Sequence, residues 1–159
     1  MSLDWDRLTP FRGPEDSPGF LLWQVTNLWQ RRLRAALAPH GLTHVQFVLL
    51  AGLGWLERIE AGAPVTQAGL AAFCKTDAMM TSQVLRALEA EGLVARRRHP
   101  TDSRARALTL TAAGRGRLEA ALPAVEAADA AFFGALAARD GDFLAGLRRL
   151  WGGAVAAPG

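Results

Sequence analysis

Positive charge is concentrated in one contiguous third of this chain. Nine of its 18 Lys and Arg residues lie between positions 75 and 117, where only four Asp and Glu residues accompany them. These nine are Lys75, Arg86, Arg96, Arg97, Arg98, Arg104, Arg106, Arg115 and Arg117. Such a concentration is typical of a surface that contacts the phosphates of nucleic acid. The alternative is a solvated face of an arginine-rich protein, and charge alone does not distinguish the two.

The segment from Asp77 to Glu91 places side chains that can contact DNA bases on one side of an expected helix. Val84, Leu85 and Leu88 share its apolar side. The opposite side carries Met79, Ser82, Gln83 and Arg86. An α-helix fits the major groove, where Gln can pair with adenine, Arg can pair with guanine and Met can touch a thymine methyl group. We therefore predict these four as base-reading residues, with an ordinary surface helix as the alternative.

A basic hairpin, or wing, is expected directly after that helix. Residues 93–98 and 106–110 have the composition of two strands, and the residues between them, from Pro100, have turn chemistry. Arg104 lies at the tip next to Asp102, which can orient its guanidinium, and such an Arg suits a narrow, electronegative minor groove. Four further basic residues are expected to meet phosphates: Lys75, Arg97, Arg98 and Arg106.

The elements that must position these residues are mostly helices. Two short helical patterns, at 66–75 and 77–91, follow each other closely enough to form a helix-turn-helix. Longer amphipathic helices are expected around this unit, at 18–37, from Thr43 to the break at 62–64, from 111 to about 138, and from Asp140 or Asp142 onward. Pro123 is expected to bend or divide the third of them. The predicted fold is mainly α with a small β-hairpin.

Length and composition indicate one compact unit. The chain has 159 residues, of which half are hydrophobic and 21% are charged, as in globular rather than disordered proteins. No apolar run is long enough to span a bilayer, and residues 1–19 are acidic and Pro-rich, unlike a secretion signal. We therefore expect a cytoplasmic protein without a membrane partner. Cys74 is the single cysteine, and no Cys/His cluster indicates a metal or another cofactor.

Several local motifs resemble the MarR (multiple antibiotic resistance regulator) family of winged-helix regulators. The wing carries the most specific one, Asp102-x-Arg104-x-x-x-Leu108-x-Leu110-Thr111-x-x-Gly114, which resembles the family signature at every fixed position. Three other stretches agree: Leu42-Thr43-x-x-Gln46, Leu70-Ala71 and Leu85-x-x-Leu88-Glu89-x-x-Gly92-Leu93-Val94-x-Arg96. All four stand in the family's order along the chain, whereas the flanking helices agree only in pattern and length.

The resemblance implies a sequence-specific regulator of transcription that binds double-stranded DNA. In such proteins the terminal helices of two chains interdigitate, so a homodimer presents two winged domains to a pseudo-palindromic operator, commonly as a ligand-responsive repressor. The implied plan has an N-terminal extension at 1–17, a dimerisation helix at 18–38, a winged helix-turn-helix region at 42–110 and C-terminal dimerisation helices at 111–156.

The resemblance also implies a small aromatic or anionic effector that enters a cleft between the dimer helices and the winged domain. The segments that would line such a cleft carry Trp23, Trp29, His40, His44, Phe47 and Trp55. Aromatic side chains also dominate protein cores, so packing is the alternative interpretation for each of them.

Three other functions are weighed against DNA binding. Some relatives sense oxidants through a cysteine, but Cys74 lies on an apolar helix face, where burial would raise its pKa. An enzyme is disfavoured because His40, His44 and His99 have no carboxylate at a ligand-like spacing, and no Gly-rich phosphate loop follows a strand. A winged-helix module that binds only proteins would carry an acidic or apolar wing, whereas this wing carries arginines.

Overall fold

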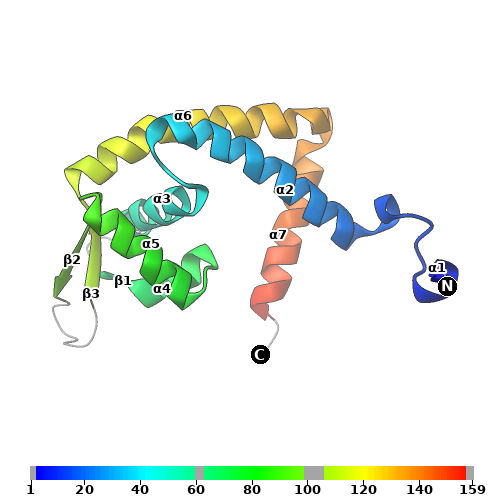
Figure 1. The fold of residues 1–159 in the computed structure, drawn as a ribbon, viewed down its shortest axis with the longest axis horizontal. Helices are drawn as coiled ribbons and strands as arrows, with labels where there is room; N and C mark the ends of the chain where they lie inside the picture. The colour runs from blue at the N-terminus through cyan, green and yellow to red at the C-terminus, as the bar shows by residue number, and fades with distance from the viewer. Residues whose placement is uncertain (1–2, 60–62, 99–105, 157–159) are drawn as a thin grey trace.

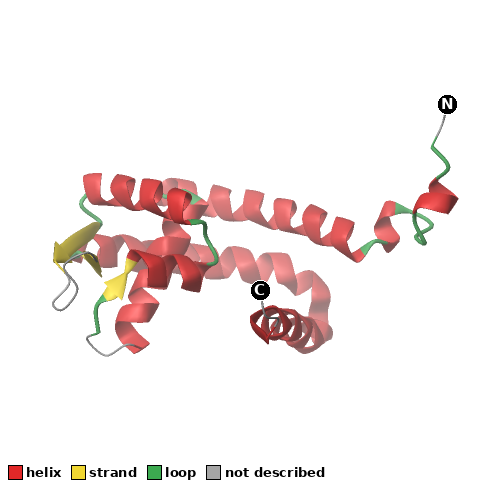
Figure 2. Ribbon diagram, turned by 90° about the horizontal axis from the view of Figure 1, so that it is seen from below, coloured by secondary structure: helices red, strands yellow, loops and turns green. Residues whose placement is uncertain are grey.

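The computed structural model describes residues 3–59, 63–98 and 106–156, without the side chains at 98, 106, 137–140 and 153–156. Its elements are α1 (Trp5–Leu8), η1 (Pro14–Asp16), α2 (Pro18–Leu37), η2 (Ala38–His40), α3 (His44–Ile59), β1 (Val65–Thr66), α4 (Gln67–Cys74), α5 (Ala78–Ala90), β2 (Val94–Arg98), β3 (Arg106–Leu110), α6 (Ala112–Phe133), η3 (Gly134–Arg139) and α7 (Asp140–Ala156). Helices α2 and α6 pack side by side, with α3, α4, α5 and the sheet gathered at one end of the pair (Figures 1 and 2).

Helix α2 is amphipathic, but only its second half is buried within the chain. Ser17 caps the helix by accepting a hydrogen bond from the Phe20 backbone at 3.4 Å, and Pro18 occupies the first turn of the helix expected at 18–37. Leu33 and Leu37 are buried in the core, whereas the apolar residues of the first half are exposed. Helix α2 therefore leaves one end of the chain with unpartnered apolar surface.

The core lies between α3, α4, α5 and the sheet. The fully buried leucines of the three helices are Leu49, Leu50, Leu53, Leu70, Leu85 and Leu88. Each buried side chain of this size stabilises the fold by roughly 1.5–3 kcal/mol relative to exposure.

The N-terminus of α3 is closed by a reciprocal cap, because the Gln46 side chain accepts from the Thr43 N–H at 2.8 Å while Thr43 accepts from the Gln46 N–H at 3.3 Å. The Leu42-Thr43-x-x-Gln46 motif is thus a helix start.

The sheet has three antiparallel strands in the order β1-β3-β2, one more than the predicted hairpin. Strands β2 and β3 pair from Val94 with Leu110 to Arg98 with Arg106, which confirms the expected wing strands. Strand β1 pairs Val65 with Leu108. The sequence missed β1 because it is only two residues long and follows a Gly-Ala-Pro stretch that indicates a break.

Helix α6 continues through Pro123 as one helix, so the alternative that this proline divides it is wrong. The helix curves along α2 in Figure 1, and the ring of the exposed Pro123 lies at the solvent side. After Phe133 the chain tightens into η3 rather than extending the α-helix, and α7 then begins at Asp140, one of the two predicted starts.

Candidate nucleic-acid interface

The turn between α4 and α5 is fixed by a set of short hydrogen bonds. Lys75 ends α4 in the left-handed conformation, with φ of 55°. Asp77 caps α5 by accepting from the Met80 N–H at 2.8 Å. The buried Thr81 hydroxyl donates to the Asp77 carbonyl at 2.7 Å and lies 2.7 Å from the Thr76 hydroxyl. These contacts set the angle at which α5 leaves the domain.

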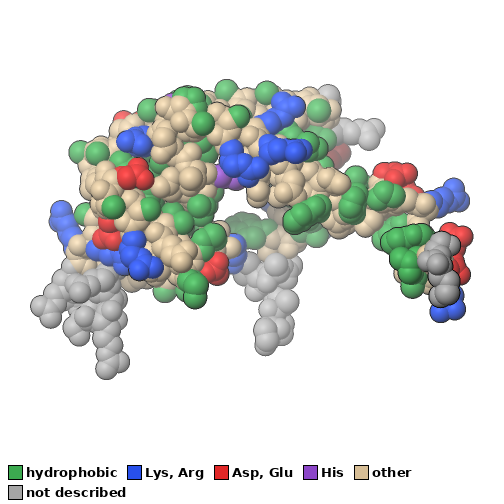
Figure 3. Space-filling view, in the orientation of Figure 1, with side chains coloured by type: hydrophobic (Ala, Val, Ile, Leu, Met, Phe, Trp, Pro, Cys, Tyr) green, Lys and Arg blue, Asp and Glu red, His purple; other side chains and the backbone are tan. Residues whose placement is uncertain are grey.

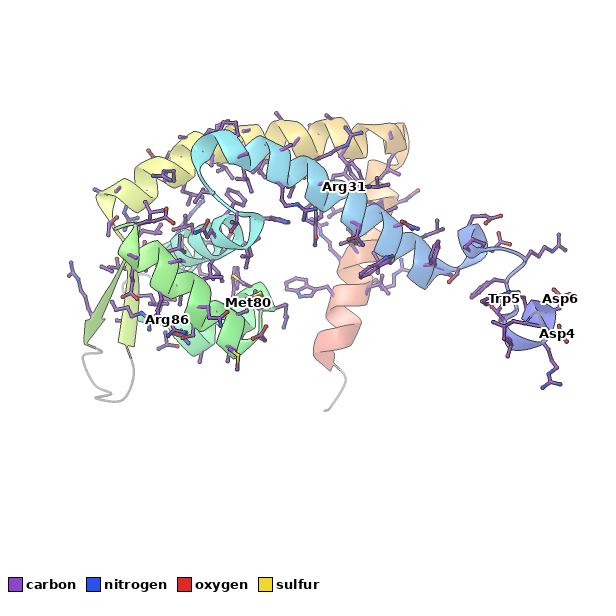
Figure 4. The ribbon with its side chains drawn as sticks, in the orientation of Figure 1. Asp4, Trp5, Asp6, Arg31, Met80 and Arg86 are labelled. Carbon is purple, nitrogen blue, oxygen red and sulfur yellow. The ribbon has the colours of Figure 1, made fainter. Side chains whose placement is uncertain are left out.

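The polar side of α5 is exposed as the sequence predicts. Leu85 and Leu88 are fully buried, whereas Met79 is 73% exposed, and Gln83 and Arg86 are also exposed. The fourth predicted residue, Ser82, is half-buried, and its carbonyl accepts from Arg86 Nε at 3.4 Å. Arg86 lies on the side of α5 that faces away from α2 and α6 (Figure 4). This helix can therefore enter a groove without unfolding any packed contact.

Basic side chains gather beside β2 and α5 in Figure 3, and Arg97 is exposed there. The strand backbone carries Arg98 and Arg106 at paired positions, but their side chains are outside the described residues. Arg104 and Asp102 also lie outside the described residues.

Among the described side chains, two of the nine basic residues in this third of the chain form ion pairs inside the domain. Arg96 Nε lies 2.7 Å from Glu89 of α5, and its Nη1 donates to Gln67 of α4 at 3.3 Å. Arg115 pairs with Glu57 at 2.9 Å. Counting charges along the sequence cannot separate such pairs from free cations. The alternation of side chains along a strand was the one feature of the sequence that could separate the two kinds of arginine. It turns Arg96 and Arg97 to opposite faces of β2.

Glu57 joins α3 to the wing and to α6. Its Oε1 accepts from the Thr109 hydroxyl at 2.7 Å and from the Leu110 N–H at 3.0 Å, while Oε2 faces Arg115. A carboxylate that accepts this many hydrogen bonds fixes the strand relative to the helix. Glu57 was not predicted, because nothing in its spacing reveals partners more than 50 residues away.

The predicted effector residues do not form one site. Trp29 and His44 meet edge to face with ring centroids 5.3 Å apart, and Trp29 Nε1 donates to Asp129 of α6 at 2.7 Å. Phe133 lies near the same indole, at 6.5 Å. Burial lowers the pKa of His44, the Arg34 charge lowers it further, and Asp129 opposes both. Asp129, Phe133 and Arg34 were not predicted.

The other four candidates are distributed elsewhere. Phe47 is buried in the core, and Trp23 is exposed on the first half of α2. Trp55 lies near the other end of α3, where Arg58 stacks over its ring at 5.2 Å. His40 belongs to η2 and is separated from α3 by the left-handed Gly41, so it does not share a helical turn with His44.

Known proteins resemble this chain in sequence and in structure. The MarR family model matches residues 42–105. The HTH-type transcriptional regulator YdcH of Bacillus subtilis is 47% identical over 148 residues, which cover 93% of this chain and 97% of YdcH. The chain belongs to the MarR family. Among solved structures, CouR from Rhodococcus jostii bound to p-coumaroyl-CoA has a TM-score of 0.74 and 27% identity, covering 94% of this chain and 98% of CouR.

A MarR-family protein of known structure, Rv2887 of Mycobacterium tuberculosis, has been solved in complex with DNA. That structure is 32% identical to this chain, with a TM-score of 0.64, and the match covers 84% of this chain and 97% of Rv2887. Rv2887 has also been solved with salicylic acid, at 33% identity and the same TM-score. The fold and the order of elements therefore agree with MarR-family proteins beyond the winged region alone.

The MarR wing signature has a structural explanation at its end. Thr111 caps α6 by accepting from the Gly114 N–H at 2.9 Å, and its hydroxyl donates to the Gly92 carbonyl at 2.7 Å. A Cβ at Gly114 would collide with the Leu93 carbonyl. Only glycine allows the first turn of α6 to rest on the start of β2, so this position joins the wing to α6.

Cys74 is half-buried, and its Sγ faces the Val48 carbonyl at 3.7 Å. Burial raises the pKa of this thiol, which disfavours the reactive thiolate and supports a packing role. Within 3–59, 63–98 and 106–156, no three His, Cys, Asp or Glu side chains group as a metal site would require. A search of the same residues found no single helix of the length and apolar character that crossing a bilayer demands.

Proposed function

We propose that this MarR-family protein is a cytoplasmic transcription repressor that binds double-stranded DNA as a homodimer, and that it is not an enzyme. The observation that carries the proposal is the exposed polar side of α5, which is held on the domain by a fully buried opposite side and flanked by Arg97 of β2. The Rv2887 structure in complex with DNA supports the proposal, because the two chains share this region.

We assign to each side chain the role that the sequence predicts for it. Gln83, Arg86, Met79 and Ser82 contact base edges in the major groove. The phosphate contacts come from Lys75, Arg97, Arg98 and Arg106. Arg104, oriented by Asp102, enters the minor groove. Arg96 and Arg115 are assigned to neither group, because each is paired inside the domain.

Dimerisation is supported by apolar surface at the two ends of the chain. The exposed residues on α2 are Phe20, Leu21, Leu22, Trp23, Val25 and Leu28, and those on α7 are Phe143, Leu144, Leu147, Leu150 and Trp151. Contiguous apolar surface of this extent marks an interaction site in a protein that is not membrane-bound. We therefore assign residues 18–38 and 111–156 to the dimer and residues 42–110 to the DNA-binding region.

Selection of DNA from a random pool by the purified protein tests the central proposal. Two symmetric half-sites are expected, because a two-fold dimer presents two copies of α5. Binding should also weaken steeply with added salt, since each neutralised phosphate releases counterions. Absence of enrichment, together with no binding in dilute buffer, would contradict the proposal.

Arg86→Ala and Arg31→Ala form a matched pair on the selected site. Both remove one exposed arginine, but Arg31 lies on α2, away from α5 (Figure 4). Arg86→Ala should weaken specific binding by about 10- to 100-fold, the usual value of one base contact, while Arg31→Ala leaves it unchanged. Arg104→Ala should also weaken binding severely with the dimer intact. Equal losses for the α2 and α5 variants would place the DNA elsewhere.

Gln83→Ala separates base reading from simple charge attraction. A side chain that reads a base changes which sequences are preferred, so selection with the variant should relax one position of each half-site. A uniform loss over all sequences would instead assign Gln83 to the phosphate backbone.

We also propose an aromatic carboxylic acid or its thioester as the effector. Salicylic acid bound to Rv2887 and p-coumaroyl-CoA bound to CouR both have this chemistry. In this chain the Trp29 and His44 rings meet between α2 and α3, and the Arg34 charge acts on His44, so an aromatic ring and an anionic group could both be held there. Binding at this junction would alter the spacing of the two copies of α5.

Release of DNA by salicylate and by p-coumaroyl-CoA tests this assignment. The release should disappear in Trp29→Phe and persist in Trp55→Phe, because only Trp29 lies beside His44. If neither compound releases DNA from the unmodified protein, the effector class is wrong. If Trp55→Phe abolishes release instead, the class stands but the site is at the other end of α3.

A further inference from the structure

Arg96 joins the wing to both helices of the helix-turn-helix. Its Nε lies 2.7 Å from Oε2 of Glu89 on α5, and its Nη1 donates to Oε1 of Gln67, the first residue of α4, at 3.3 Å. The side chains of Arg96 and Glu89 are only 24% and 28% exposed. Arg97, the next residue of β2, is exposed instead. Of these two neighbouring arginines, Arg96 is therefore the one that is turned towards the protein.

The guanidinium of Arg96 is held in place by its two partners. Its Nε is close to Glu89 without the alignment of a hydrogen bond, so the attraction of opposite charges holds that pair. Its Nη2 is buried and has no hydrogen-bond partner among the described residues. Burial of a charge is costly unless the charge is paired, so removal of Glu89 would leave Arg96 without compensation. A side chain in these surroundings keeps one orientation and is not free to reach a phosphate.

The ion pair fixes the angle between α5 and β2. The chain passes from α5 to β2 through three residues. Within this turn the Gly92 N–H donates to the Glu89 carbonyl at 2.9 Å, and the Leu93 N–H donates to the Leu88 carbonyl at 2.9 Å. The pair of Arg96 with Glu89 adds a contact beyond the turn, between the last turn of α5 and the middle of β2. The helix and the strand are therefore held together at two places.

We propose that Arg96 is a positioning residue for DNA binding, which fixes the angle between α5 and the wing together with Glu89 and Gln67 and touches no phosphate itself. The inference rests on the proposed function, in which α5 enters the major groove and the wing contacts the DNA beside it. The duplex sets the distance between these two places. A protein whose helix and wing already have the matching angle binds both without losing conformational freedom, so it binds more tightly.

Arg96→Gln and Arg115→Gln form a matched pair that separates positioning from a general loss of stability. Each removes the cation of one internal ion pair, but Arg115 joins α6 to Glu57 of α3, which keeps its hydrogen bonds to β3. On the selected DNA site Arg96→Gln should raise the dissociation constant by roughly tenfold, whereas Arg115→Gln should leave it nearly unchanged. Circular dichroism at the temperature of the assay checks that both variants are folded. Equal losses would contradict the proposal.

The salt dependence of binding separates positioning from phosphate contact. Arg97→Gln should reduce the slope of log K against log[salt] by about 0.9, the value for one phosphate, while Arg96→Gln should leave the slope unchanged. Arg97→Gln should also cost less affinity when Arg96→Gln is already present, because a wing that is no longer held at its angle contributes less to binding. An equal change of slope in both variants would make Arg96 a phosphate contact. Strictly additive losses would show that Arg96 does not act through the wing.

Exchange of the two charges tests the pair even if Arg96→Gln does not fold. Glu89→Arg and Arg96→Glu should each weaken DNA binding, and the double variant should recover at least part of the loss, because the ion pair is restored in reverse. No recovery of binding in the double variant, or unchanged binding by a folded Arg96→Gln protein, would overturn the positioning role but leave the regulator intact. An unmodified protein that ignores DNA in dilute buffer would instead contradict the proposed function.

Discussion

The winged region and the two ends of the chain differ in how far their large apolar side chains are buried. In α3, α4 and α5 the large leucines are fully buried within one chain, although the region also has to expose a DNA-binding side. On α2 and α7 residues of the same type are exposed, Trp23 to 67% and Leu150 to 71%. The winged region therefore forms its core within one subunit, whereas each end supplies only half of a core. Substitutions at the two regions should therefore fail in different ways.

The largest effect is expected at the joint between the regions, from Gly114→Ala. The added Cβ would meet the Leu93 carbonyl, which belongs to the backbone and cannot rotate away. Either α6 or the start of β2 has to shift, at a cost of about 2–3 kcal/mol or more. Urea unfolding measures this loss as a lower free energy of unfolding.

Gly116→Ala is the matched control for that joint. It lies two residues further along α6, where an added Cβ would meet no atom within 4 Å. Alanine is a better helix former than glycine, so this variant should gain about 0.5–1 kcal/mol. If both variants lost the same stability, a collision at Leu93 would not be the cause.

A second pair of substitutions compares a leucine of α2 that is buried within the chain with one that is exposed on the same helix. Leu33 is buried in this chain, whereas Leu28 is exposed. Leu33→Ala should lower the free energy of unfolding by about 2–4 kcal/mol, at low and at high protein concentration alike. Leu28→Ala should instead raise the dimer dissociation constant, as measured by ultracentrifugation. A Leu28→Ala protein with an unchanged dissociation constant would remove the first half of α2 from the interface.

Features that depend on neighbouring residues could be predicted from the sequence. The starts of helices expected near residues 18, 66, 77 and 111 agree with the structure, in which Ser17, Thr66, Asp77 and Thr111 each cap the helix that follows. The exposed side of α5 followed from helical periodicity. Both depend on neighbours within a few residues, and both were confirmed.

Contacts between distant segments were not predictable from local patterns. Asp129 meets Trp29 across 100 positions, and Glu57 meets Thr109 across 52. Strand β1 forms only because β3 offers it a free edge. A single sequence contains no signal for such pairs, so it could not show that, of the six candidate effector residues, Trp29 and His44 meet within one chain. Their distances depend on how the helices pack, which residue type alone does not reveal.

Lys75→Gly should stabilise the otherwise complete winged region. Lys75 is the one non-glycine residue with positive φ among the described residues. The left-handed conformation costs a residue with a side chain about 1–2 kcal/mol, which glycine would avoid. Glycine also gives the unfolded chain more conformational freedom, and this offsets part of the gain. We expect a net gain of about 0.5–1 kcal/mol in thermal or urea unfolding.

Lys75→Ala separates the backbone effect from the loss of charge. It removes the same ammonium group but keeps the strained φ, so it should not gain stability. Both variants should weaken DNA binding and reduce its salt dependence by about one phosphate contact. If the two variants were equally stable, strain at this turn would not limit the stability of the domain.

The smallest expected effect is a pH dependence at His44, where the two regions meet. Its pKa in the folded protein lies below the ordinary value of 6.5, chiefly because of burial. The unfolded chain therefore takes up a proton as the pH falls below about 6.5, while folded His44 remains neutral until lower pH. This contribution to stability is present at pH 7.5 and is progressively lost as the pH falls towards the lower folded-state pKa.

Unfolding measured at pH 7.5 and pH 5.5 checks the sign and the cause. His44→Gln should reduce the stability difference between the two pH values, because it removes the titrating group. Arg34→Gln should reduce it only partly, since Arg34 is the second cause and burial remains. Asp129→Asn should increase the difference, because it removes the charge that favours protonated His44 while its amide oxygen still accepts from Trp29. If Asp129→Asn instead reduced the stability difference between the two pH values, the contacts at the junction between the regions would have rearranged. The loss of the Asp129 charge beside His44 would then not explain the result.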